Sequence, residues 1–154
     1  MKIFRGPLVS FNIVKATTIK ERKDMKTLLE FSKHFDFKDM FYCTSPDICS
    51  IEPQKNEPNY YQYEFYMSLN LPVKFENDQD GKLQTLERLV VEDALIMRRA
   101  DNEEKYFTAD KDLRDYAKKN YKFILSSKTY FVITEVMGEK VIDVYIPIEG
   151  GSFE

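Results

Sequence analysis

The sequence predicts an α+β fold in one domain, built from two units that each have the order strand, helix, strand, strand. Two observations carry this prediction. Stretches in which apolar residues alternate as in β-strands recur along the chain, and two stretches of helical spacing separate them. The chain has 154 residues, which fits a single domain. We therefore predict one domain over residues 1–154, with pseudo-repeats at about 8–72 and 86–149.

Composition and charge narrow the class of protein. Apolar residues make up 43% of the chain and charged residues 32%, the balance of a soluble globular domain. The net charge is −3 and no basic block stands out, so nucleic-acid binding is not expected. No apolar run approaches the roughly 18 residues of a membrane-spanning helix, and no signal peptide is evident. These features predict a cytoplasmic protein with no membrane partner.

The first half contains three expected strands and one expected helix. Leu8–Lys20 is rich in β-branched residues and alternates like a strand. Lys23–Phe37 has apolar residues at helical spacing and predicts a helix. Phe41–Thr44 is a short strand, and the three prolines of Ser45–Asn59 predict a loop. Tyr60–Leu71 is the third expected strand.

The alternation of this third strand defines two faces, because side chains alternate along a strand. One face is apolar and is expected in the core: Tyr61, Tyr63, Phe65, Met67 and Leu69. The other face is amphipathic and is expected to meet solvent or a cavity: Tyr60, Gln62, Glu64, Tyr66, Ser68 and Asn70.

The second half repeats the order. Leu86–Arg99 is interpreted as a strand, although a helical period also fits its first residues. Thr108 is expected to cap a helix that continues to about Leu125. Thr129–Val136 and Lys140–Ile148 are expected to form a closing hairpin that Pro147 and the following Gly-Gly pair end. In the last strand Asp143 and Tyr145 share the face opposite three aliphatic residues.

Six residues of this closing strand, Asp143–Ile148, read Asp-Val-Tyr-Ile-Pro-Ile. Together with the duplicated order, and with Tyr63-Glu64 where relatives often carry Tyr-Asp, they make the chain resemble the GyrI-like effector-binding domains. The resemblance implies an antiparallel sheet with two helices on one face and a cleft between the helices. Many members place a Glu for cationic ligands where this chain has Tyr130-Phe131. The chain also resembles a Firmicute family encoded near type VII secretion genes, which implies an accessory or regulatory role.

The two amphipathic strand faces offer four candidate ligand-binding residues, Glu64, Tyr66, Asp143 and Tyr145, and the resemblance adds Tyr130 where relatives place their Glu. Carboxylates on the floor of a cleft would attract cations, and phenols would add stacking and hydrogen bonds. The alternative, that both acids are solvated strand residues, stays open. The sequence shows no catalytic constellation and no cofactor motif. His34 is its single histidine and has no evident partner ligands, so no metal site is predicted.

These observations predict a stand-alone, non-enzymatic domain that binds a hydrophobic small molecule in an aromatic and acidic cleft. The alternative is an accessory or regulatory protein that docks a protein partner. In that case either the aromatic strand Tyr60–Asn70 or the proline-rich segment Ser45–Asn59 would form the docking surface.

Overall fold

The computed structural model describes residues 3–20, 43–69, 83–99, 106–120, 122–137 and 139–152. The helix predicted at Lys23–Phe37, with His34, lies outside these residues. Within them there are seven strands and one helix: β1 Ile3–Lys20, β2 Cys43–Pro53, β3 Tyr61–Leu69, β4 Leu83–Arg99, α2 Tyr106–Asn120, β5 Lys122–Leu125, β6 Thr129–Val136 and β7 Glu139–Ser152.

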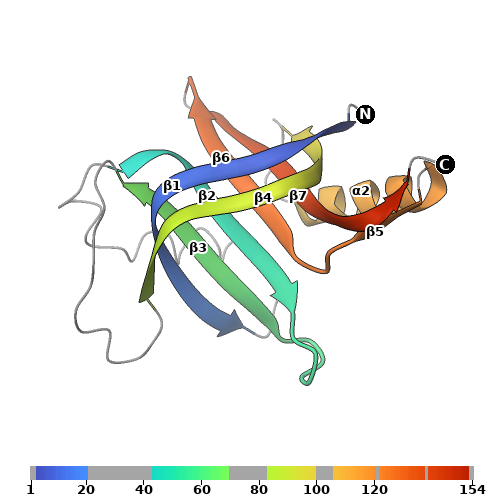
Figure 1. Cartoon of the computed structure of the whole chain (residues 1–154), viewed down its shortest axis with the longest axis horizontal. Helices are drawn as coiled ribbons and strands as arrows, with labels where there is room; N and C mark the ends of the chain where they lie inside the picture. Colours follow the sequence, from blue (N-terminus) through green and yellow to red (C-terminus); the bar gives the residue numbers. More distant parts are fainter. Residues whose placement is uncertain are drawn as a thin grey trace.

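Six of the strands form a closed antiparallel sheet (Figure 1). The order β4-β1-β3-β2-β6-β7 closes because the last residues of β4 pair with β7, Arg98 opposite Asp143. β5 lies outside this ring and pairs with the end of β7. The expected antiparallel sheet and the β6–β7 hairpin are confirmed. The described part of the chain contains one helix, where two were predicted for the whole chain.

Strand β2 is longer than the sequence indicated. It runs from Cys43 to Pro53, so the prediction of a loop from residue 45 onward was wrong for its first half. The register against β3 shifts between Thr44 and Ile48, and this irregularity accommodates Pro46 within the strand. Buried side chains such as Ile48 then hold the segment in the sheet.

The C-terminal boundaries differ in a related way. Helix α2 ends at Asn120, and Lys122–Leu125 forms β5 instead of extending the helix. These residues pair with the Gly150-Gly151 segment, which continues β7 to Ser152 rather than ending it. A tertiary partner therefore overrides both the local helical pattern and the Gly-Gly signal.

The sheet is buried on both faces. On one face, here called the helix face, α2 packs through Ala109, Leu113 and Ala117 against a large apolar cluster. A second cluster covers the opposite face and contains Leu8, Ile13, Ile48, Tyr66, Leu89, Val91, Ala94, Tyr130 and Val132. The apolar face of β3 is core, as predicted. On its amphipathic face Glu64, Tyr66 and Ser68 are also buried, so this part of β3 is central to the sheet rather than half-solvated.

Asn12 reverses the alternation of β1. Its φ of 53° lies in the left-handed region, which is uncommon outside glycine but accessible to asparagine. Ile13 packs in the cluster of the opposite face, and the hydroxyl of Ser10 contacts that of Ser68 on the same face. In a regular strand Ser10 and Ile13, three positions apart, would lie on opposite faces. They share one face because the backbone at Asn12 interrupts the alternation.

Helix α2, with 15 residues, is too short and too polar to cross a membrane, and no other helix lies in the residues that the structure describes.

Candidate functional site

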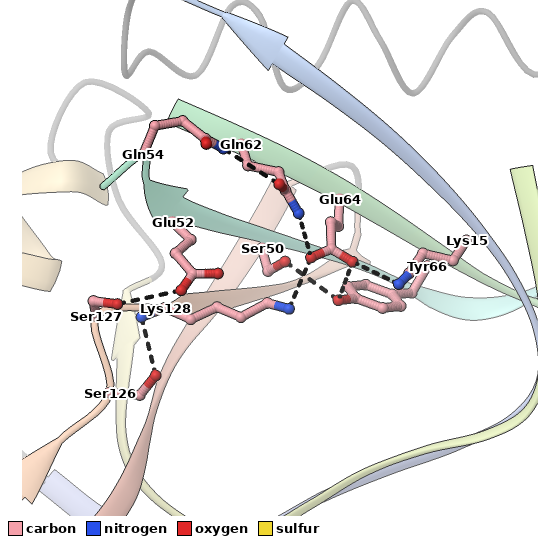
Figure 2. A network of polar contacts seen from close by, with 10 residues as sticks. All are labelled: Lys15, Ser50, Glu52, Gln54, Gln62, Glu64, Tyr66, Ser126, Ser127 and Lys128. Atoms are coloured by element: carbon pink, nitrogen blue, oxygen red, sulfur yellow. Dashed lines mark hydrogen bonds and ion pairs between the residues drawn. The ribbon is translucent and has the colours of Figure 1, made fainter. Parts of the chain in front are cut away.

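Glu64 lies at the centre of a polar cluster on the opposite face of the sheet. Its side chain is about 5% exposed, and two lysines reach its carboxylate from opposite sides (Figure 2). Lys15 Nζ lies 3.0 Å from Oε2, and Lys128 Nζ lies 2.9 Å from Oε1. Gln62 Nε2 also donates to Oε1 at 3.1 Å, and the Tyr66 hydroxyl donates to Oε2 at 3.1 Å.

Strand alternation and register bring these residues together. Glu64 and Tyr66 are two positions apart on β3 and therefore share a face. Lys15 on β1 pairs with Tyr66, and Ser50 on β2 pairs with Glu64. Tyr130 on β6 pairs with Ser50 in turn. Four neighbouring strands thus contribute one face to the cluster, which we call the Glu64 cluster (Lys15, Ser50, Glu64, Tyr66, Lys128 and Tyr130).

Two tyrosine rings form the apolar wall of the cluster. The ring centroids of Tyr66 and Tyr130 lie 5.9 Å apart with an interplanar angle of 37°. Lys128 Nζ lies 5.3 Å from the Tyr130 centroid and 5.9 Å from the Tyr66 centroid. An ammonium group at such distances is attracted by both rings. Lys128 is therefore held by the carboxylate and by the two rings together.

The environment fixes the protonation states. Burial alone would raise the pKa of Glu64, but hydrogen bonds and charges from Lys128 and Lys15 lower that pKa to about 2. Burial, followed by the neighbouring Tyr130, raises the pKa of Tyr66. Burial would lower the pKa of Lys128, and its Tyr66 and Glu64 neighbours raise it. Near neutral pH Glu64 is therefore ionised, Lys128 is charged and Tyr66 is protonated.

Asp143 and Tyr145 lie on the same face but have other partners. Arg98 on β4 donates to both oxygens of Asp143, from Nε at 2.8 Å and from Nη2 at 3.2 Å. Tyr145 pairs with Tyr130 across the β6–β7 ladder and packs against the opposite-face cluster. Burial, foremost, and the Asp143 charge raise the pKa of Tyr145. The structure thus gathers Glu64, Tyr66 and Tyr130, places Tyr145 beside them and pairs Asp143 with an arginine.

The sequence did not predict Lys15 and Lys128 as residues of the site. The alternation of β1 placed Lys15 on a strand, and Lys128 comes two residues before Tyr130, but neither has a local signature of a site. Lysine is normally exposed, so burial of its charge is not expected without a known partner. Only the register of strands far apart in sequence shows that both reach one carboxylate.

A second polar group lies on the helix face and fastens α2 to the sheet. Arg114 donates from Nε to Asp110 at 2.9 Å, from Nη1 to the Ser126 carbonyl at 2.7 Å and from Nη2 to Thr129 Oγ1 at 2.9 Å. The Thr129 hydroxyl donates to Asp110 at 2.9 Å. The group borders a hollow of about 250 Å³ lined by Ile51, Pro53, Tyr61, Asp110, Arg114, Ser127 and Thr129.

Among the residues that the structure describes, no three His, Cys, Asp or Glu side chains lie close enough together to hold a metal ion. Cys49 is buried, with its Sγ 3.7 Å from the Phe131 carbonyl oxygen. This environment is that of a core side chain.

Known proteins resemble this chain in structure but not in sequence. No protein-family model and no curated protein matches the sequence. The C-terminal domain of EcmrR has 13% identity and a TM-score of 0.64 over 97% of this chain and 99% of that one. SAV2435 bound to tetraphenylphosphonium has 8% identity and a TM-score of 0.58 over 97% and 95%. A hydrolase from Listeria innocua has 8% identity and a TM-score of 0.56 over 96% and 92%.

These similarities establish the fold. The chain shares its fold with the C-terminal domain of EcmrR and with SAV2435, so the resemblance noted in the sequence is supported at the level of the fold alone. One neighbour is called a hydrolase, which agrees with the general rule that a fold hosts several functions. Function must therefore be argued from the Glu64 cluster itself.

Proposed function

We propose that this chain is a cytoplasmic effector-binding domain, which binds a small hydrophobic molecule at the Glu64 cluster and performs no catalysis. The observation that carries the proposal is the buried Glu64 carboxylate held between Lys15 and Lys128, beside Tyr66 and Tyr130. Removing the Glu64 carboxylate from water is costly, and groups with perturbed pKa values, here Glu64, Tyr66 and Lys128, concentrate at functional sites. A shared fold with SAV2435, which was solved with tetraphenylphosphonium bound, supports the same assignment.

The protonation states support binding over catalysis. A carboxylate whose pKa is about 2 is a weak base near neutral pH. Tyr66, with its raised pKa, is a weak acid under the same conditions. Neither group is tuned for proton transfer, whereas both suit hydrogen bonding and packing around a bound molecule.

Binding can be tested with a library that contains equal numbers of cationic, anionic and neutral aromatic compounds. We expect a subset to raise the midpoint of thermal unfolding of the wild-type chain, because a ligand that binds only the folded state stabilises it. The shift should disappear in Tyr130→Ala and persist in Tyr60→Ala, a matched change on an exposed loop. Hits that survive Tyr130→Ala unchanged, or a complete lack of hits, would contradict the proposal.

A protein-interaction role is the second candidate, and it includes the accessory role near type VII secretion. The strand Tyr60–Asn70 cannot offer its faces as predicted, because its described side chains from 63 to 68 are buried. The surface that favours this role is instead a strip of about half-exposed apolar residues, Val9, Phe11 and Val90, on the paired strands β1 and β4. Capture of a defined partner from native lysate that Phe11→Glu abolishes would support it, and equal capture by both chains would exclude it.

A further inference from the structure

We infer that the Glu64 cluster selects an aromatic anion, such as an aryl carboxylate or aryl sulfonate, rather than an organic cation. The inference rests on the proposed binding function and specifies the charge of the ligand. It reverses the expectation that the acids on the sheet would attract cations.

The carboxylate of Glu64 has little capacity left for a cationic ligand. A carboxylate offers about four acceptor sites. In this structure Oε1 accepts from Lys128 and Gln62, and Oε2 accepts from Lys15 and Tyr66. A ligand cation would have to displace one of these donors and would also meet two ammonium groups.

The charge at the centre of the cluster favours an anion, whereas the charge at its rim does not. Lys15 and Lys128 together outweigh Glu64 by one positive charge. Asp143, the other predicted acid on this face, is matched by Arg98. Glu52 lies at the edge of the network and accepts a hydrogen bond from Ser127 Oγ at 3.4 Å, so its charge opposes an anion from the rim (Figure 2).

Lys15 and Lys128 also have N–H donors that the contact with Glu64 does not use. An ammonium group carries three N–H donors, and the contact with Glu64 uses one of them. The side chains of Lys15 and Lys128 are 22% and 20% exposed, whereas that of Glu64 is 5% exposed. A ligand that approaches from solvent therefore reaches the ammonium groups before it reaches the carboxylate.

The tyrosines explain why the anion should be aromatic. Lys128 Nζ lies between 5 and 6 Å from the centroids of both Tyr66 and Tyr130, at 5.9 and 5.3 Å. An anionic group bound to Lys128 would bring its attached ring beside these tyrosines. Tyr66 and Tyr130 are 3% and 7% exposed, so contact with the ring requires the Lys128 side chain to shift. Aromatic rings packed in tilted or offset contact stabilise each other beyond the burial of their area.

Pairs of probes with one shape and opposite charge test the inference directly. Tetraphenylborate and tetraphenylphosphonium form a large pair, and benzoate and benzamidinium form a small planar pair. Calorimetric titration of the full chain in low-salt sodium buffer should show at least tenfold tighter binding of the anion in one pair or both. Glu64→Gln should strengthen anion binding severalfold, because it removes the opposing charge.

The lysine variants locate the binding. Lys128→Met should weaken anion binding at least tenfold, and Lys15→Met should do so independently if Lys128→Met does not fold. Lys118→Met, which makes the same change at an exposed end of α2, should leave anion binding unchanged. Circular dichroism confirms that each variant is folded before titration.

Each remaining outcome overturns the inference. Tighter binding of the cations would leave the proposed function intact and reverse the ligand charge. Anion binding that both lysine variants retain would place the anion elsewhere on the molecule. Failure of all four probes to bind would also refute the inference, while the library screen described above decides the binding function separately.

Discussion

Lys128 reaches across strand β2 to place its ammonium nitrogen 2.9 Å from Oε1 of Glu64, a residue 64 positions away in the sequence. Lys128 directly precedes β6, and Glu64 lies on β3, so the pair joins two strands that are not neighbours in the sheet. Lys15 brings β1 to the same carboxylate. One buried charge thus connects three strands, and its effect on stability can be measured.

Lys128→Met should lower the free energy of unfolding by about 1–3 kcal/mol. Removal of one partner from a buried ion pair leaves an uncompensated charge and commonly costs more than this, but Lys15 still balances Glu64 here. Urea denaturation at pH 7 gives the value. Lys118→Met on the exposed end of α2 should change it by less than about 0.5 kcal/mol. Equal effects of the two substitutions would show that the ion pair contributes nothing.

Acid should remove the contribution of Glu64. Its pKa is about 2 in the folded chain and its ordinary value is 4.5, so the folded state favours the ionised form. A depressed pKa stabilises the fold above pH 4.5, and this contribution, on the order of 2 kcal/mol, is lost as the pH falls from 4.5 to 2. The difference in unfolding free energy between the wild type and Glu64→Gln should therefore shrink over this range. A difference that stays constant with pH would contradict the assignment.

Thr129→Val should loosen α2. The Thr129 hydroxyl accepts from Arg114 and donates to Asp110 in a buried setting, so valine leaves two polar groups without this partner at a cost of about 1–3 kcal/mol. Thr134→Val on the same strand removes only a 3.4 Å contact to the Val141 carbonyl and should cost less. Hydrogen exchange of the α2 amides should accelerate in the first variant alone. Equal exchange in both variants would assign the attachment of α2 to its apolar contacts.

Substitutions of Asn12 test whether the left-handed backbone conformation at this position affects stability. A β-branched residue is strained in the left-handed region, so Asn12→Val should destabilise the fold by about 1–3 kcal/mol. Asn12→Gly should be close to neutral, because glycine adopts this conformation readily. Thermal denaturation of the two variants separates backbone strain from loss of the asparagine side chain. Similar destabilisation by both would point to the side chain.

Alternation of residues was sufficient to predict the strands that are central to the sheet. β3, β4, β6 and β7 follow this pattern closely, and Glu64 and Tyr66 were placed on one face for the same reason. Most of β2 was predicted as a loop because of its prolines. The sequence does not show that a register shift accommodates Pro46. The end of α2 was misplaced because the partner of β5 is the distant Gly150-Gly151 segment.

The site was predicted only in part for a similar reason. Local pattern located an acid and several phenols, but the charge around them depends on strand pairing. Lys15 and Lys128 reach Glu64 from distant parts of the sequence, and Arg98 reaches Asp143 across the β4–β7 seam. The expected attraction for cations assumed carboxylates without such partners.

The position of β1 in the sheet has a consequence for synthesis of the chain. Ile3 pairs with Met97, and Lys20 pairs with Tyr61, so the described partners of β1 both come much later in the chain. The backbone of β1 can form its hydrogen bonds to β3 and β4 only after these strands have been synthesised. Strand pairing between segments so far apart in sequence is slow. We expect nascent chains that stop before β4 to remain protease-sensitive in β1, and chains that extend beyond β7 to be protected there.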